Sequence, residues 1–181
     1  LADIDPATWW EQIAWVPQRP TITPGTVLDN VLDHVEPGTS TAEGVPDVLV
    51  EAARATGFDE VVDSLPQGWR TPVGSAGVGL SVGQRQRLAL TRALCSTAPM
   101  VVMDEPTAHL DAASEAHVLD AVRALHASGR TVVVIAHRPA LMALAEQTIA
   151  VTSQPVPPAP PAGLAADRDP AREATAQEET L

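Results

Sequence analysis

Lysine is absent from the chain: all eleven basic residues among its 181 positions are arginines. A mechanism that requires a lysine within these residues is therefore excluded. Cysteine occurs once, at Cys95, so no disulfide can form within the chain. Its position in an expected helix favours a buried, unreactive thiol, as is usual in a reducing cytoplasm.

Long apolar runs are also missing. Segments such as residues 132–136 fall far short of the roughly 20 apolar residues that cross a membrane, so no transmembrane helix is expected. The N-terminus lacks the basic and apolar regions of a signal peptide, and because it begins with Leu1 we expect a piece of a longer chain. Basic residues are few: the net charge is −12, which disfavours broad contact with nucleic acid or anionic lipid.

Apolar segments alternate with turn signals over residues 1–152, a length that suits one domain with a substantial core. The expected strands are residues 12–16, 99–103 and 131–136. The expected helices are residues 45–56, 81–96 and 114–127, with a helical turn within residues 25–35 and a flexible glycine-rich loop at residues 74–79. Because apolar strands separated by helices are typical of parallel sheets covered on both faces, the predicted class is α/β.

The last part of the chain differs in composition. Residues 153–181 are rich in proline and alanine and show no helical or strand periodicity, so we expect a disordered tail. A short partner-binding motif within this tail is the alternative.

Two carboxylates follow a short apolar strand. Residues 100–103 are all apolar, and Asp104 and Glu105 come where the chain leaves the sheet. In open parallel sheets ligands bind beyond the carboxyl ends of the strands, where one acid can organise Mg²⁺ and the other can polarise a water. A strand followed by a solvated acidic turn is an equally good interpretation of these residues alone.

His137 occupies the same place after the next apolar strand. A neutral imidazole there could hydrogen-bond a phosphate oxygen or an attacking water. A structural histidine is the commoner case, but the shared position with Glu105 on a neighbouring strand favours function. Gln18 follows the first strand, and its amide could reach a metal or a water, although an isolated glutamine is usually surface decoration.

A helix N-terminus is predicted at Ser81. Ser81 followed by Gln84 fits a capping box, which by itself explains both residues. The same N-terminus offers free N–H groups and a positive dipole end to an anion, and Gly83 lets a phosphate approach the backbone closely. Capping and phosphate contact can coexist only if the serine hydroxyl is shared or turned outward.

Together these segments resemble ABC ATPases. Gln18 resembles the Q-loop glutamine, residues 80–84 the LSGGQ signature, residues 101–105 the Walker B strand with its catalytic glutamate, residues 110–111 the D-loop, and His137 the switch histidine. The five elements occur in the family's order over residues 1–151. The resemblance implies a P-loop NTPase-like (RecA-like) parallel sheet core whose N-terminal part is missing, with an ABC helical subdomain over about residues 39–95.

The resemblance also implies roles in ATP hydrolysis. Glu105 would be the general base for the water that attacks the γ-phosphate, and His137 would steady that water and the phosphate. Asp104 and Gln18 would complete the Mg²⁺ environment, with Gln18 at the hinge of the helical subdomain facing the membrane part.

The implied partner is a second ABC ATPase domain, because the family works as a head-to-tail pair. Ser81, Gly83 and Gln84 would grip the γ-phosphate of ATP held by that partner. Asp111 would cross the interface and couple the two sites. The transmembrane domain of the same transporter would be the other partner, which places the domain at the cytoplasmic face of the cell membrane.

Three departures from the family pattern matter. The Walker A loop, GxxGxGK[ST], is absent, so we expect it upstream of Leu1 and expect no ATPase activity from the chain alone. Val82 stands where the first signature glycine is usual, which predicts weakened rather than lost phosphate contact. Ser75 lies near the place where exporters often carry a glutamate that contacts the transmembrane helices.

Among ABC proteins, the chain is most similar to the thiol reductant exporters needed for cytochrome bd assembly. The segments that carry this similarity are residues 15–20, 24–31, 104–111 and 136–141. Members of that family form heterodimers and are associated with export of cysteine and glutathione. The leading hypothesis is therefore an exporter ATPase. The alternatives are a non-hydrolysing domain that lends its signature helix to a catalytic partner, and a soluble ABC ATPase of DNA repair or translation.

Overall fold

The computed structural model describes residues 5–32, 44–74, 77–108 and 110–151. Two compact units are distinguished, Leu1–Gln147 and Thr148–Leu181. Every helix and strand of the described residues belongs to the first unit, and residues 148–151 carry none. Several expectations fall outside the described residues: the tail at 153–181, the first residues of the helical subdomain at 39–43, Ser75 and His109.

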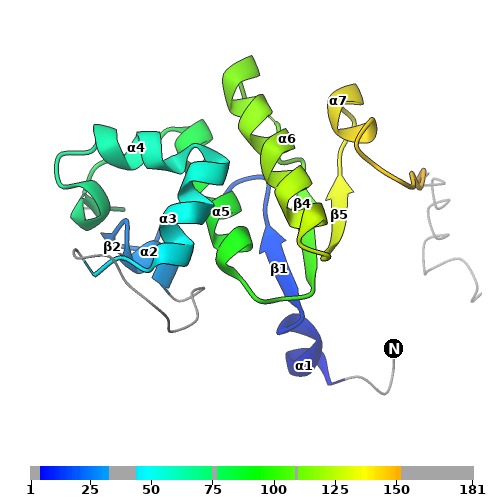
Figure 1. The fold of residues 1–181 in the computed structure, drawn as a ribbon, viewed down its shortest axis with the longest axis horizontal. Coiled ribbons are helices and arrows are strands. Elements are labelled where there is room, and N and C mark those ends of the chain that lie inside the picture. Colours follow the sequence, from blue (N-terminus) through cyan, green and yellow to red (C-terminus); the bar gives the residue numbers. More distant parts are fainter. Residues whose placement is uncertain (1–4, 33–43, 75–76, 109, 152–181) are drawn as a thin grey trace, which may run out of the picture. The chain divides into compact units, whose positions relative to one another are not determined.

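The first unit contains seven helices and five strands among its described residues, labelled in Figure 1. The strands are β1 (Ile13–Val16), β2 (Gly25–Thr26), β3 (Pro72–Val73), β4 (Met100–Asp104) and β5 (Thr131–Ile135). The helices are α1 (Pro6–Trp10), α2 (Asp29–Leu32), α3 (Asp47–Thr56), α4 (Phe58–Ser64), α5 (Val82–Cys95), α6 (Ala112–Ala127) and α7 (Pro139–Met142), with a 3₁₀ turn at Gly68–Arg70. None of the helices among the described residues is long and apolar enough to cross a membrane.

The main sheet is parallel, as predicted, with strand order β1-β4-β5. Its strands include the three predicted apolar runs, which end at the same edge because they run in the same direction. Ala14 pairs with Val101 and Val101 with Val132, so residues two apart along these strands share one face. That face, with Val16 and Met103, packs against α5 and α6 in a single apolar cluster.

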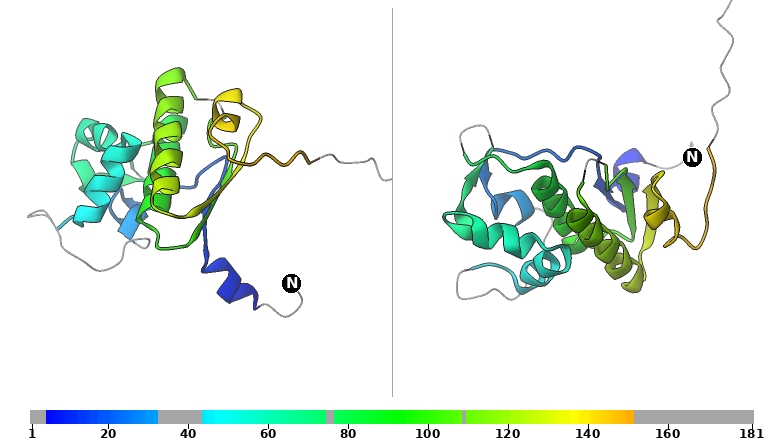
Figure 2. Two further views of the ribbon diagram at one scale, coloured as in Figure 1. Left: turned by 45° about the vertical axis from the view of Figure 1, so that its right-hand side comes forward. Right: turned by 90° about the horizontal axis from the view of Figure 1, so that it is seen from above.

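The prediction that both sheet faces are covered is wrong for the described residues. On the other face the side chains of Trp15, Val133 and Ile135 are 49%, 43% and 51% exposed. Both long helices lie on one side of the sheet, where they contact each other (Figure 2). An apolar composition indicates that a strand is suited to burial on both faces, but it does not show whether helices cover the second face.

Helix α5 connects this sheet to a second apolar cluster. Ala89 and Leu90 pack with the sheet, whereas Leu88 and Cys95 pack with α2, α3 and α4. Figure 1 shows α5 between these helices and the strands. Cys95 is buried, which raises the pKa of its thiol to about 11 and keeps it protonated and unreactive, as predicted.

Several elements differ from the sequence-based predictions. The expected helical turn within residues 25–35 is present as the short helix α2, but it is preceded by a two-residue strand, β2, that was not predicted and that pairs with β3. Helix α3 begins at Asp47 because Pro46 occupies its N-cap position, two residues later than predicted. The helices α1, α4 and α7 were not predicted, since four to seven residues are too few to display a helical period.

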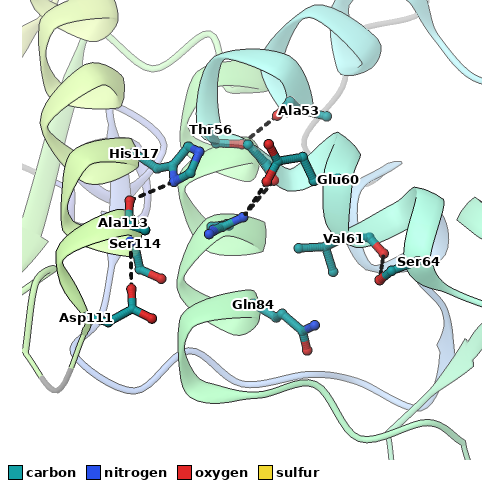
Figure 3. A network of polar contacts seen from close by, with 12 residues as sticks. Ala53, Thr56, Glu60, Val61, Ser64, Gln84, Asp111, Ala113, Ser114 and His117 are labelled. Carbon is teal, nitrogen blue, oxygen red and sulfur yellow. Dashed lines mark hydrogen bonds and ion pairs between the residues drawn. The ribbon is translucent and has the colours of Figure 1, made fainter.

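Gly57 ends α3 in the left-handed conformation, with φ 65° and ψ 18°, the geometry for which glycine is the usual helix C-cap. A Cβ at this position would lie 2.3 Å from the ring of His117, which bonds the carbonyl of Ala113 on α6 (Figure 3). Gly57→Ala is therefore expected to lower the free energy of unfolding by about 1–2 kcal/mol or more, measured by urea denaturation.

Gly129→Ala is the matched control for this substitution. Gly129 also has a positive φ, 80°, but a Cβ there would meet nothing within 4 Å. Its replacement is expected to cost only the backbone contribution, and therefore less than Gly57→Ala. A Gly57→Ala variant as stable as the wild-type chain would show that this left-handed cap and its crowding by His117 do not constrain the fold.

Candidate active site

Glu105 and His137 meet at the carboxyl ends of two adjacent strands. Asp104, the last residue of β4, pairs with Ile135 of β5, and the N–H of Glu105 donates to the carbonyl of Ile135 at 2.8 Å. His137 follows two residues after β5 ends. Its Nδ1 lies 3.1 Å from Oε1 of Glu105. Parallel pairing thus brings together two side chains that are 32 positions apart in the sequence.

The backbone of Glu105 is in the left-handed region, with φ 43°. Among the described residues it is the only one besides glycine with a positive φ. The following Pro106 favours an extended preceding residue, so this conformation is strained, and it persists because the ladder bond to Ile135 and the bond from Ala108 N–H to the Glu105 carbonyl hold it. Such strain concentrates at functional sites, and here it turns the carboxylate out of the strand.

The bond between the two side chains defines what His137 can do. When Nδ1 donates to the Glu105 carboxylate, the role of Nε2 depends on the protonation state of the ring. In a neutral imidazole Nε2 accepts a hydrogen bond, and in a protonated one it donates. The His137 side chain is 74% exposed, whereas that of Glu105 is 32% exposed. The imidazole is therefore accessible to a ligand at this edge, with its orientation set by the acid beside it.

Asp104 is partly buried and stands apart from this pair. Alternation along β4 places its side chain on the face opposite Met103, beside Ile135 on the uncovered side of the sheet. Gln18, also partly buried, lies two residues beyond the end of β1, at the same carboxyl edge. Both offer oxygen ligands, which Mg²⁺ prefers.

The described residues contain no group of three or more acidic, histidine or cysteine side chains that could hold a metal by themselves. Mg²⁺ is usually bound by one or two carboxylates together with phosphate oxygens and water. Asp104 and Gln18 fit that pattern of few protein ligands, with the remaining ligands coming from a nucleotide.

The capping box predicted at the start of α5 is present. The Ser81 hydroxyl accepts from the Gln84 N–H at 3.2 Å, and Gln84 Oε1 accepts from the Ser81 N–H at 2.8 Å. Because Ser81 acts as an acceptor, its own hydroxyl proton is available for an anion. The side-chain amide nitrogen of Gln84 likewise takes no part in the box, and Figure 3 shows this side chain beside the first turn of α5.

Gly83 has a packing function in addition to the phosphate contact that remains a prediction. A Cβ on Gly83 would lie 3.1 Å from the Ser114 hydroxyl and 3.8 Å from Leu110, so α5 and the start of α6 approach closely here. Val82, at the place of the usual first signature glycine, is 44% exposed and therefore fits without a clash.

Asp111 is the N-cap of α6, which the sequence analysis missed. Its Oδ1 accepts from the Ser114 N–H at 2.8 Å (Figure 3). Hydrogen bonds from the Ser114 backbone and hydroxyl hold the pKa of Asp111 below its usual value. The signal was available, since aspartate is among the preferred N-cap residues and the predicted helix began only three positions later. The exposed carboxylate remains ionised at the surface where a partner is expected.

The sequence model of the ABC transporter family matches residues 2–108. The chain is 43% identical over 140 residues to the ATP-dependent lipid A-core flippase of Methylococcus capsulatus, an alignment that covers 75% of the chain and 22% of the flippase. It is 39% identical over 151 residues to the mycobactin import ATP-binding/permease protein IrtB of Mycolicibacterium thermoresistibile, covering 83% of the chain and 25% of IrtB.

A solved structure gives the same result for the fold. The structure of a bacterial Atm1-family ABC exporter with ATP bound is similar to 79% of the chain, with a TM-score of 0.66 and 32% sequence identity, and the match covers 24% of that exporter chain. The chain thus spans about a quarter or less of the length of these relatives. The predicted parallel sheet core is confirmed. The chain belongs to the ABC transporter family and has the ABC ATPase fold.

Proposed function

We propose that the chain is part of the ATP-binding and ATP-hydrolysing domain of an ABC exporter, in which hydrolysis drives export across a membrane. The observation that carries this proposal is the 3.1 Å contact between Glu105 and His137 at the ends of neighbouring parallel strands. The strained backbone of Glu105 supports it, because the acid is held in one position at some cost in stability.

In this function Glu105 is the general base. Its carboxylate accepts a proton from the water that attacks the γ-phosphate. His137, protonated on both ring nitrogens, donates from Nδ1 to Glu105 and from Nε2 to a phosphate oxygen. Asp104 and Gln18 would hold Mg²⁺, which would neutralise charge on the phosphate oxygens. Little covalent chemistry is required of the protein, so positioning of these groups accounts for most of the rate.

A second ABC ATPase domain completes the site in a head-to-tail dimer. The N-terminus of α5 presents the Ser81 hydroxyl proton, the Gln84 amide and the backbone near Gly83 to the γ-phosphate of ATP held by the partner domain. Asp111 lies at the same interface. The transmembrane domain of the same transporter is the other partner, and the domain works at the cytoplasmic face of the cell membrane without nucleic acid.

The phosphate-binding loop with its lysine is supplied by another part of the same polypeptide. The relatives support this proposal, because they are more than three times as long as this chain. We propose a thiol such as cysteine or glutathione as the cargo, on the similarity of residues 15–20, 24–31, 104–111 and 136–141 to thiol exporters. Uptake of labelled glutathione by inverted membrane vesicles that contain the whole transporter tests this cargo.

ATP turnover tests the proposal at two levels. The isolated 181-residue chain is expected to show no measurable hydrolysis, because no lysine is available to bind the phosphates. The complete protein that carries the chain is expected to hydrolyse ATP at rates ordinary for the family. Malachite-green phosphate release measures both.

Two outcomes would contradict this proposal. Turnover by the isolated chain that disappears in Glu105→Gln would mean that these residues hold their own phosphate site. A complete protein that binds ATP without hydrolysing it would favour the non-hydrolysing alternative, in which the chain lends its α5 N-terminus to a catalytic partner.

A further inference from the structure

Arg138, the residue directly after His137, forms an ion pair that the proposed mechanism does not use. Its Nη1 donates to Oε2 of Glu115, in the first turn of α6, at 2.7 Å. The two side chains are 36% and 19% exposed. A charge-assisted bond this short between partly buried groups fixes the relative position of the two backbone segments.

The backbone of Arg138 is restrained from the other side as well. Arg138 is the N-cap of α7, with φ −81° and ψ 131°, and Pro139 at the first helical position favours this extended conformation. Its carbonyl accepts from the Met142 N–H at 3.2 Å. The residue that follows His137 is therefore held through both its main chain and its side chain.

His137 itself has little other support. Its imidazole is 74% exposed, and within the described residues its polar partner is Glu105 alone. The approach of Nδ1 to the Glu105 carboxylate thus depends on where the backbone at 137–138 is held. The small hollow beside the pair is lined by both side chains and by Arg138.

Glu115 also belongs to the same helical turn as Asp111. The Glu115 N–H donates to the Asp111 carbonyl at 2.9 Å, and Asp111 caps that turn through Ser114. A continuous series of bonds therefore runs from Asp111 through the first turn of α6 to Glu115, Arg138, His137 and Glu105.

We infer that the Arg138–Glu115 ion pair is a positioning device that holds His137 against Glu105 and couples this pair to the Asp111 loop. The catalytic meaning of this inference rests on the proposed function, whereas the positioning itself does not. A surface staple between α6 and α7 is the alternative. Both roles use the same ion pair and would stabilise the fold equally, so a stability measurement does not separate them.

The imidazole ¹⁵N signals of His137 in the 181-residue chain do separate them. Arg138→Gln and Glu115→Gln are each expected to shift the Nδ1 signal toward that of a free imidazole, in the same direction as Glu105→Gln. Arg138→Lys is expected to restore part of the shift. The exchanged pair, Glu115→Arg with Arg138→Glu, is expected to restore most of it.

Arg123→Gln is the matched control, because Arg123 forms an exposed ion pair with Asp120 on the same helix α6. It is expected to leave the His137 signals unchanged, and the backbone amide spectrum verifies that each variant is folded. The inference would be overturned if the His137 signals were unchanged in both Arg138→Gln and Glu115→Gln but shifted in Glu105→Gln. Signals that are unchanged in all three variants would overturn it too, since the His137–Glu105 bond would then be absent in solution.

ATP turnover by the complete protein distinguishes failure of this inference from failure of the proposed function. Arg138→Gln is expected to lower kcat about tenfold with little change in the KM for ATP. Shifted His137 signals with unchanged kcat would leave the positioning role in place and remove the catalytic role of His137. Unshifted signals would remove the positioning role, whatever the turnover.

Discussion

Glu105→Gln is expected to lower the turnover number of the complete transporter for ATP by at least ~10²-fold while ATP still binds, because proton transfer by a positioned side chain contributes about 10²–10⁴-fold to enzymatic rates. Glutamine has nearly the same shape as glutamate, and its amide oxygen can still accept from His137 Nδ1, which lies 3.1 Å from the carboxylate oxygen of Glu105 in the wild-type chain. The substitution therefore removes the base and leaves the surrounding geometry. Phosphate release and retention of labelled ATP measure the two effects.

Glu146→Gln provides a matched control for this experiment. Glu146 also faces a histidine, His126, at 3.6 Å, but both side chains are largely exposed, and His126 lies in the last turn of α6. Its replacement is expected to leave turnover unchanged. If Glu105→Gln behaved like this control, the base would have to be another residue.

Asn30→Ala is expected to cause a large loss of stability. Asn30 is 4% exposed, and its side chain makes five hydrogen bonds. Its Oδ1 accepts from Thr23 N–H, from the Thr23 hydroxyl and from Arg92 Nη2, and its Nδ2 donates to the carbonyls of Thr23 and Thr26. Arg92, on α5, also donates to the Asn30 and Thr21 carbonyls.

Removing this side chain leaves several buried groups without their partners. Each buried polar group that loses its bond costs roughly 1–3 kcal/mol, so the free energy of unfolding is expected to fall by about 3 kcal/mol or more, measured by urea denaturation. Thr23→Val, which removes one of the five bonds from an exposed residue, is expected to cost about 1 kcal/mol. A loss in Asn30→Ala no larger than that control would contradict the assigned network.

The Asn30 network also has a consequence for the site. The segment that it bonds to α5 is the one that follows Gln18, and the N-cap of α5 is Ser81, at the expected phosphate contact. Loosening it is therefore expected to disturb both ends of the proposed site together, in addition to lowering stability.

Local sequence signals predicted the elements that carry the site. The apolar runs at residues 99–103 and 131–136 gave β4 and β5, and Ser81 with Gln84 gave the capping box of α5. These predictions succeeded because strand burial and helix capping depend on residues only a few positions apart. The family motifs then placed Glu105 and His137 on neighbouring strands, and the structure has them in contact.

Features that depend on distant partners could not be predicted in the same way. The bonds between Asn30 and Arg92 join residues 62 positions apart, and the two-residue strands β2 and β3 exist only because they pair with each other. The left-handed backbone of Glu105 could not be predicted from the sequence, because a proline favours an extended conformation in the residue before it. The uncovered sheet face was not predicted, because apolar strands indicate that both faces suit burial but do not show whether other elements pack on both.

The most direct test of the central claim is a structure of the complete transporter carrying Glu105→Gln, with ATP and Mg²⁺ bound. The γ-phosphate is expected within about 2.7–3.2 Å of His137 Nε2, with a water between the phosphate and residue 105. The Ser81 end of the partner's α5 is expected on the opposite side of the same phosphate. A γ-phosphate bound out of reach of both His137 and residue 105 would contradict the assignment of this strand edge as the site of hydrolysis.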